Sequence, residues 1–139
     1  MNQTNDKLIN ALLIALICLD VFYVIIVFFF PESWFQFMHG TSYNDPQGLL
    51  RRTGAGWAAF ALFHFITLIR WKETPNWLAL SAGIRLTEIF TDWAYLYFSQ
   101  DITWIGGISL FLAAPINALL GWYFFTSSVT AVKQKYGEG

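Results

Sequence analysis

The chain has 139 residues, of which 56% are apolar and 12% are charged, and its formal net charge is -1. This share of charged residues is about half that of a typical soluble domain, so too few charges are present to cover a water-facing surface. Nucleic acid is excluded as a partner because no run of Lys and Arg is present to contact phosphates. Cys18 is the only cysteine, which excludes an intramolecular disulfide and a cluster of thiolate metal ligands. The composition indicates a small integral membrane protein surrounded by lipid.

Four apolar stretches are each long enough to cross a bilayer, which takes about 20 residues. We expect one transmembrane helix from each of Leu8–Phe30, Leu49–Trp71, Trp77–Phe98 and Trp104–Val129. Short connectors join the last three stretches, so neighbouring helices should be antiparallel. A chain of this length rarely divides into two cores, so residues 1–139 should form one domain. The predicted fold is an all-α integral membrane protein, an antiparallel four-helix bundle with a long loop between its first two helices.

The first span carries Asp20 near its middle, with mostly apolar residues on both sides. A charge near the bilayer centre costs at least about 2.5–3.5 kcal/mol, so such a residue faces a partner or a cavity. We expect Asp20 either to meet Arg85 or His64 across the bundle or to be protonated. Adhesion between helices is the simplest role for it.

The loop over residues 31–48 is rich in aromatic residues, so we expect it to lie against the membrane interface. Interface anchors are predicted at the ends of the spans, where arginine can reach lipid phosphate and tryptophan prefers the headgroup region. These anchors are Arg51, Arg52, Trp71, Trp77 and Trp104.

The start of the second span, Gly48-Leu49-Leu50-Arg51-Arg52-Thr53-Gly54-Ala55-Gly56-Trp57, resembles two groups of small four-helix membrane proteins. In ergosterol-biosynthesis scaffold proteins this span opens with a similar Arg-Thr-x-Gly-x-Trp sequence, which here would be Arg52-Thr53-Gly54-Ala55-Gly56-Trp57 with an extra glycine. That resemblance implies a non-catalytic protein that holds partner enzymes at the membrane. The chain also resembles the DoxX-like group, which implies an association with redox or quinone-linked membrane complexes. Neither resemblance assigns a catalytic residue.

The third span has three charged residues on one helical stripe, because Arg85, Glu88 and Asp92 follow one another at spacings of three and four. The second span contains His64, and the fourth contains Asn117 near its middle. Each span therefore offers a polar group to a shared interior. We expect Arg85 to contact Glu88 or Asp92, and His64 to bond to Asp92 or Asp20.

Two roles are open for this polar cluster. The ion pairs can fix the rotation of the helices, or a carboxylate that stays protonated in low dielectric can carry a proton. Metal binding is disfavoured because the His-x3-His and Glu-x-x-His spacings of metal sites in helix bundles are absent. We expect no metal and no cofactor.

The orientation follows from the Lys and Arg residues near the span ends, because cytoplasmic loops hold the excess. One side has five, namely Lys7, Arg70, Lys72, Lys133 and Lys135, whereas the other has Arg51 and Arg52. Both termini should be cytoplasmic. The excess is modest and leaves insertion in both orientations open.

Three functions compete at this stage. The favoured one is a non-catalytic scaffold or accessory subunit, whose partners are membrane lipid, a second copy or other subunits of a membrane complex, or an apolar small molecule. The second is a small homodimeric transporter that uses the intramembrane acids to couple transport to protons. The third is a membrane enzyme acting on a sterol-like or isoprenoid-like lipid, with His64 and an acid as proton donor and acceptor. The absence of a catalytic motif favours a protein that is not an enzyme.

Overall fold

The computed structural model describes residues 3–137, which form five helices and no strand. The helices are α1 (Gln3–Phe29), α2 (Pro31–His39), α3 (Leu49–Arg70), α4 (Asn76–Phe98) and α5 (Trp104–Tyr136). The all-α prediction is confirmed. The four long helices follow the four predicted stretches closely, except that α1 begins earlier and α5 ends later.

The prediction of a long loop between the first two helices was wrong in part, because half of that segment forms the short helix α2. Pro31 occupies the start of α2, where its missing N–H costs no helical hydrogen bond. The helix ends at Gly40, whose φ of 66° is left-handed and whose N–H donates to the Gln36 carbonyl at 3.0 Å. Trp34, Phe35 and Phe37 thus lie on a helix, whereas Tyr43 lies in the loop that follows it.

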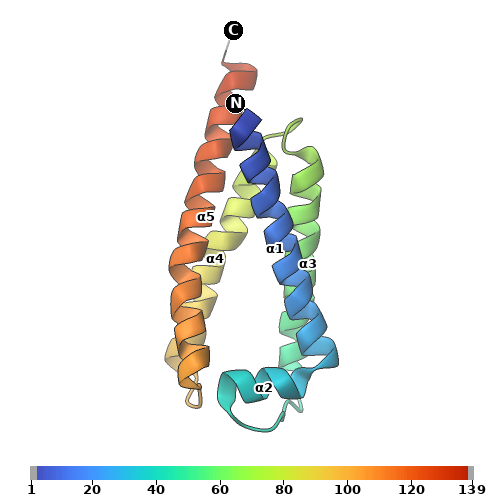
Figure 1. Cartoon of the computed structure of the whole chain (residues 1–139), viewed down its shortest axis with the longest axis vertical. Coiled ribbons are helices and arrows are strands. Elements are labelled where there is room, and N and C mark those ends of the chain that lie inside the picture. The colour runs from blue at the N-terminus through green and yellow to red at the C-terminus, as the bar shows by residue number, and fades with distance from the viewer. Residues whose placement is uncertain (1–2, 138–139) are drawn as a thin grey trace.

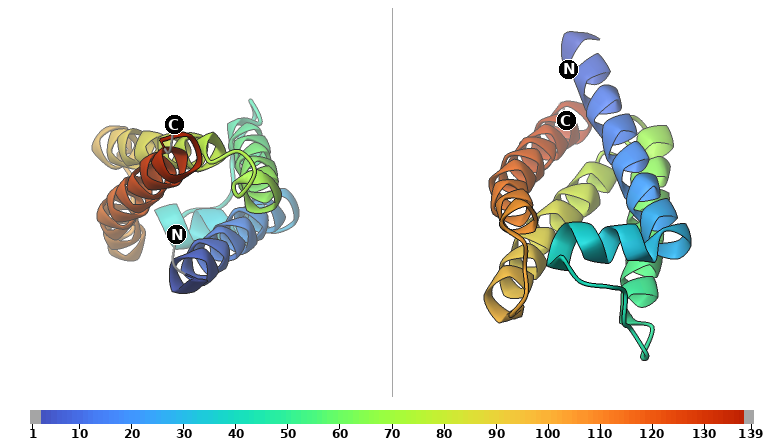
Figure 2. Two further views of the ribbon diagram at one scale, coloured as in Figure 1. Left: turned by 90° about the horizontal axis from the view of Figure 1, so that it is seen from above. Right: turned by 60° about the horizontal axis from the view of Figure 1, so that its bottom comes forward.

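The four long helices form two antiparallel pairs, α1 with α3 and α4 with α5. Within each pair, the two helices contact each other closely along their lengths. Figure 1 shows the two pairs converging at the end that holds both termini and separating toward the opposite end. Seen from above in Figure 2, the pairs lie on opposite sides of the bundle, and α2 crosses beneath them.

The apolar core lies at the end where the two pairs converge. It consists of fully or almost fully buried residues from three helices, α1, α4 and α5, and from the turn after α3: Ile9, Leu13, Leu16, Trp71, Leu78, Ala82 and Phe124. The interface-anchor prediction for Trp71 was wrong. This side chain is only 3% exposed because its ring packs in the core and its indole N–H donates to Asn10 Oδ1 at 2.9 Å.

At the opposite end, α2 connects the two pairs. Its first turns contact α1 and α3 through Trp34, whose ring centroid lies 5.7 Å from that of Tyr23 and 5.6 Å from that of Trp57. Its last turn contacts the connector between α4 and α5, where Thr103 N–H donates to the Met38 carbonyl at 2.8 Å. The helix α2 therefore spans the space over which the two pairs have separated.

The start of α3 is capped by a side chain that precedes it. The Asp45 carboxylate accepts hydrogen bonds from the N–H groups of Leu49 and Leu50, both at 2.9 Å. Partial desolvation raises the pKa of Asp45, but these two backbone bonds, together with those from the Tyr43 hydroxyl and the Gly48 N–H, hold the pKa below its ordinary value. Arg51 and Arg52 lie in the first turn of this capped helix, and both are exposed.

Two of the described helices are long and apolar enough to cross a membrane, over Asn5–Phe29 of α1 and Trp104–Tyr136 of α5. The helices α3 and α4 run beside them over a similar height (Figure 1). They are less uniformly apolar, and α4 carries Arg85, Glu88 and Asp92 within a single stretch.

The close contact between α1 and α3 depends on Gly54. A Cβ atom at this position would clash with Val27 Cγ2 and would lie 2.9 Å from Phe28 Cε2, and Val27 is itself fully buried. We predict that Gly54→Ala separates the pair and lowers the midpoint of thermal unfolding in detergent, at a cost of about 1–3 kcal/mol.

The matched control is Gly56→Ala, two residues along the same helix, where an added Cβ meets nothing within 4 Å. That change should leave the midpoint unchanged or raise it, because Ala is the better helix former by about 1 kcal/mol. Equal effects of the two substitutions would contradict the close approach at Gly54.

Candidate functional site

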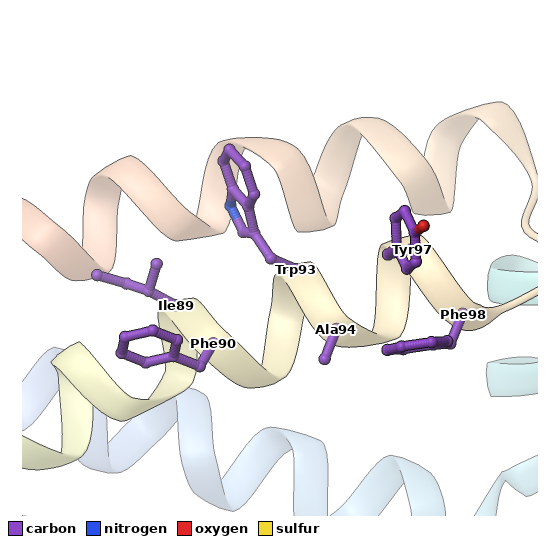
Figure 3. A pocket seen from close by; sticks show the side chains of 6 residues that line it. All are labelled: Ile89, Phe90, Trp93, Ala94, Tyr97 and Phe98. Atoms are coloured by element: carbon purple, nitrogen blue, oxygen red, sulfur yellow. The ribbon is translucent and has the colours of Figure 1, made fainter.

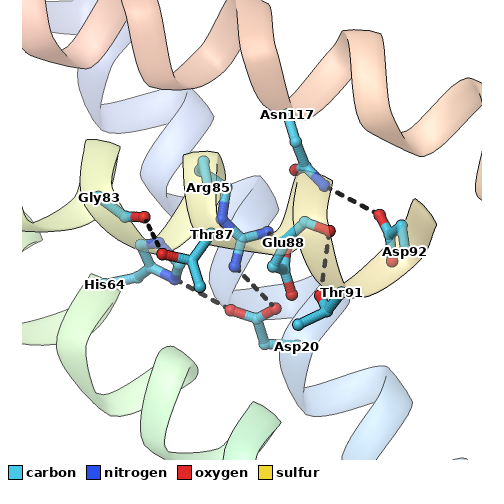
Figure 4. A network of polar contacts seen from close by, with 9 residues as sticks. All are labelled: Asp20, His64, Gly83, Arg85, Thr87, Glu88, Thr91, Asp92 and Asn117. Carbon is cyan, nitrogen blue, oxygen red and sulfur yellow. Dashed lines mark hydrogen bonds and ion pairs between the residues drawn. The ribbon is translucent and has the colours of Figure 1, made fainter. Parts of the chain in front are cut away.

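Four ionisable side chains meet in the interior at about mid-length of the bundle, and we call them the central cluster. Asp20 comes from α1, His64 from α3, and Arg85 and Glu88 from α4 (Figure 4). Asp20, His64 and Arg85 are at most 2% exposed, and the Glu88 side chain is 14% exposed. The cluster lies just beyond the apolar core, where the two helix pairs begin to separate.

The contact between Asp20 and His64 fixes the tautomer of the histidine. His64 Nδ1 lies 2.9 Å from Asp20 Oδ2, and an ionised carboxylate only accepts hydrogen bonds, so Nδ1 carries a proton and donates it. The other ring nitrogen, Nε2, is buried and has no hydrogen-bond partner within the described part of the chain. In the neutral ring this nitrogen carries a free lone pair.

Arg85 joins the two helix pairs. Its Nη1 donates to Glu88 Oε2 at 2.8 Å within α4, and its Nη2 lies 3.5 Å from Asp20 Oδ1 on α1. The second distance is that of an ion pair without a formed hydrogen bond, and Nη2 and Nε are buried without a hydrogen-bond partner among the described residues. Of the Lys and Arg residues within 3–137, Arg85 is the only one that is buried.

The predicted contacts of this cluster are present in the structure. Arg85 contacts Glu88, and His64 bonds to Asp20, as the sequence predicted. The stripe on α4 faces inward, because Ser81 and Arg85 are buried and Glu88 and Asp92 are half-buried on the same face.

Asp92 and Asn117 form a second, looser contact between α4 and α5. Asn117 Nδ2 donates to Asp92 Oδ2 at 3.5 Å, the long limit of a hydrogen bond (Figure 4). Asn117 is 7% exposed, whereas Asp92 is half-buried. Asp92 has no ion pair with a Lys or Arg side chain among the described residues, in contrast to Asp20 and Glu88.

Polar contacts that the sequence did not predict continue on both sides of the cluster. Toward the apolar core, Thr67 Oγ1 and Ser81 Oγ lie 2.8 Å apart in a buried contact between α3 and α4. Toward α2, His39 Nε2 lies 2.6 Å from the Tyr95 hydroxyl, and His39 Nδ1 contacts the Asp101 carbonyl. Because a carbonyl only accepts, Nδ1 carries the proton in that ring. His39 belongs to the aromatic segment over residues 31–48, which we had expected to lie against the membrane interface.

The remaining predicted anchors lie at the ends of the helices. Arg51 and Arg52 are exposed at the start of α3, Trp104 is 76% exposed at the start of α5, and Trp77 is half-buried at the start of α4. None of them contacts the central cluster.

The outer face of α4 is a continuous apolar surface. Ile89, Phe90, Trp93, Ala94, Tyr97 and Phe98 line an open groove along it (Figure 3). A second apolar groove lies between α4 and α5, where the Trp93 and Phe111 rings are stacked with their centroids 6.4 Å apart. These surfaces point away from the central cluster, so polar and apolar features occupy opposite faces of α4.

We predict that Arg85→Met lowers the free energy of unfolding by about 3–5 kcal/mol, because Asp20 would remain buried as an uncompensated charge. Adding Asp20→Asn should recover much of this loss. Denaturant unfolding in detergent micelles measures both changes.

The control is Arg70→Met, which removes an exposed ion pair with Glu73 and should cost less than about 1 kcal/mol. A loss from Arg85→Met no larger than this control would show that the buried pair does not hold the helices together.

The comparisons with known proteins give no relative from which a function could be transferred. No protein-family model, no curated protein and no solved structure matches the chain. The resemblances seen around Arg52-Thr53-Gly54-Ala55-Gly56-Trp57 stay predictions from the sequence. The functional argument therefore depends on the geometry of this chain alone.

Proposed function

We propose that the protein is a four-span integral membrane protein that acts as a non-catalytic scaffold or accessory subunit for membrane partners or an apolar ligand. The observation that carries this proposal is the distribution of side chains. Large apolar residues are exposed on all four long helices, for example Phe22 at 55%, Leu62 at 58%, Phe90 at 77% and Leu119 at 71%. The charged groups of the central cluster are buried. Lipid favours this arrangement and water does not.

The lengths of the helices support four spans. With a rise of about 1.5 Å per residue, the 22 residues of α3 and the 23 of α4 extend about 33–35 Å, enough for a hydrocarbon core of about 30 Å. The charges of α4 are compatible with insertion because Arg85 and Glu88 pair with each other and with Asp20. All four long helices then cross the bilayer, and α2 lies near one interface.

The charges at the two ends support cytoplasmic termini. The end with both termini and the turn between α3 and α4 contains Lys72, which pairs with Asp6 at 3.2 Å, and Lys135, which contacts the Glu73 carbonyl. Arg51 and Arg52 lie at the opposite end. An excess of Lys and Arg on one side favours that side as cytoplasmic.

The apolar surface of α4 and α5 supports an accessory role. The two grooves on this side are lined almost entirely by apolar groups, and the polar groups of α4 are engaged on its inner face. Such a surface suits a lipid tail, an apolar ligand or the helix of another subunit. The polar side-chain groups among its lining residues are limited to the Tyr97 hydroxyl and the Trp93 indole N–H.

A topology measurement tests the four spans. In a Cys18→Ser background, single cysteines are introduced as Gln47→Cys, Gln100→Cys, Glu73→Cys or Lys135→Cys, all at exposed positions. A membrane-impermeant maleimide should label the first two in intact cells and the last two only after the membrane is opened. Labelling of Gln47→Cys and Gln100→Cys on different sides would contradict four spans.

A purification in mild detergent, followed by mass spectrometry and an absorbance spectrum, tests the accessory role. We expect a partner protein or an apolar ligand in stoichiometric amount, which Asp92→Asn should retain because Asp92 faces away from the α4 grooves. The substitution Phe90→Ser, on the outer face of α4, should reduce it. A colourless homodimer without any partner would contradict the accessory role.

The second candidate is a small homodimeric transporter coupled to protons. The specific observation in its favour is that the ion pair between Asp20 and Arg85 connects the two helix pairs, which contact each other closely only near the termini. A change in the charge of that ion pair would alter the contact between the two helix pairs.

A further inference from the structure

We propose that the central cluster together with Asp92 is a proton-binding site, in which Asp92 carries one exchangeable proton and His64 Nε2 accepts another. This role goes beyond a scaffold and does not depend on it. The site requires only the buried contacts of this chain. Each step is a simple protonation, of the Asp92 carboxylate to the acid and of the neutral His64 imidazole to the imidazolium.

The first argument is the charge of the interior. The groups that face one another are Asp20 and Tyr23 on α1, His64 on α3, and Arg85, Glu88 and Asp92 on α4, and the nearest group from α5 is the uncharged Asn117. When Tyr23 and His64 are neutral, three carboxylates face one guanidinium and the set carries two excess negative charges. Unpaired charge is costly in a buried site, so binding of protons lowers its energy.

The geometry identifies Asp92 as the carboxylate of this set that has no ion-pair partner among the described residues. Asp20 and Glu88 each lie within 3.5 Å of the Arg85 guanidinium, which stabilises their ionised forms. Asp92 forms no ion pair with this guanidinium, and its hydrogen-bond partner is the amide of Asn117, at 3.5 Å. Its side chain is half-buried, so protons reach it from outside the cluster. Asp92 is therefore the member with both the weakest compensation and the best access.

The second acceptor is identified by an unpartnered atom. His64 Nε2 is fully buried and has no hydrogen-bond partner in the described part of the chain, while Nδ1 donates to Asp20. A carboxylate on Nδ1 holds the ring in the tautomer with its lone pair on Nε2 and stabilises the imidazolium once that lone pair binds a proton. Protonation of both Asp92 and His64 would bring the net charge of the set from minus two to zero.

The dimensions of the site favour a proton over a larger cation. Asp20, His64 and Arg85 are at most 2% exposed, so these three side chains are closed off from solvent. Within residues 3–137, no group of three or more His, Cys, Asp or Glu side chains is placed to hold a metal ion. A proton needs neither space nor a coordination shell.

Infrared spectroscopy of the purified protein in lipid nanodiscs tests the role of Asp92. We expect the carbonyl band of a protonated carboxyl group at neutral pH and its loss at alkaline pH. Labelling all aspartates with ¹³C should shift the band in the unmodified protein, and Asp92→Asn should remove it. The control Glu73→Gln, at a carboxylate that is 71% exposed, should leave it unchanged.

Three results would overturn the assignment to Asp92. The first is the absence of any protonated carboxyl band that changes with pH. The second is a band that does not shift on aspartate labelling, which would place the proton on a glutamate. The third is a band that survives in Asp92→Asn. Because the labelling uses the unmodified chain, the test stands even if a variant fails to fold.

Nitrogen NMR of ¹⁵N-histidine in the same nanodiscs tests the role of His64. The two histidines are separated by His39→Gln. We expect His64 Nε2 to be unprotonated at alkaline pH and protonated at acidic pH, and Asp20→Asn should weaken its proton binding by at least tenfold. A His64 signal that does not change with pH, or that is indifferent to Asp20→Asn, would overturn this part of the proposal.

Discussion

The ion pair between Asp20 and Arg85 is the contact on which the middle of the molecule depends. Both side chains are almost fully buried, and they come from different helix pairs. Beyond this point the pairs separate, and the buried apolar core of the described residues lies at the terminal end. A buried charge is stable only beside a partner, and removing either member leaves the other uncompensated. His64 and Glu88 complete the contact by binding the free sides of the same two groups.

The three levels of the bundle are held by different physical interactions. At the terminal end, apolar side chains from α1, α4, α5 and the turn after α3 form a conventional core around Leu78 and Phe124. In the middle, the ion pairs of Arg85 with Asp20 and Glu88 replace apolar packing. At the far end, α2 holds the pairs through aromatic packing of Trp34 on one side and, on the other, through the hydrogen bond that the Met38 carbonyl accepts from the Thr103 N–H. The apolar core therefore lies at the terminal end, and the half-buried Asp92 lies in the half where the two pairs are farther apart.

The helix α4 combines the features on which the two proposals depend. Its inner face has the stripe from Ser81 through Arg85 to Asp92, and its outer face has the apolar groove around Phe90 and Trp93. A surface role for the outer face and a proton-binding role for the inner face are compatible, because the two faces share no residue. If both hold, a partner on α4 would lie one helix diameter away from the protonation site, and the helix itself would link them.

The sequence by itself determined the number and approximate positions of the long helices, because about 20 apolar residues between polar connectors leave few alternatives. It also placed Arg85, Glu88 and Asp92 on one inward face, since helical periodicity fixes which residues share a stripe. Only the tertiary structure decided which helices pair, that Asp20 binds both His64 and Arg85, and that Asp92 lacks a cation. It likewise buried Trp71 and folded residues 31–39 into a helix across the bundle. These features depend on contacts between residues up to 65 positions apart, which local pattern does not encode.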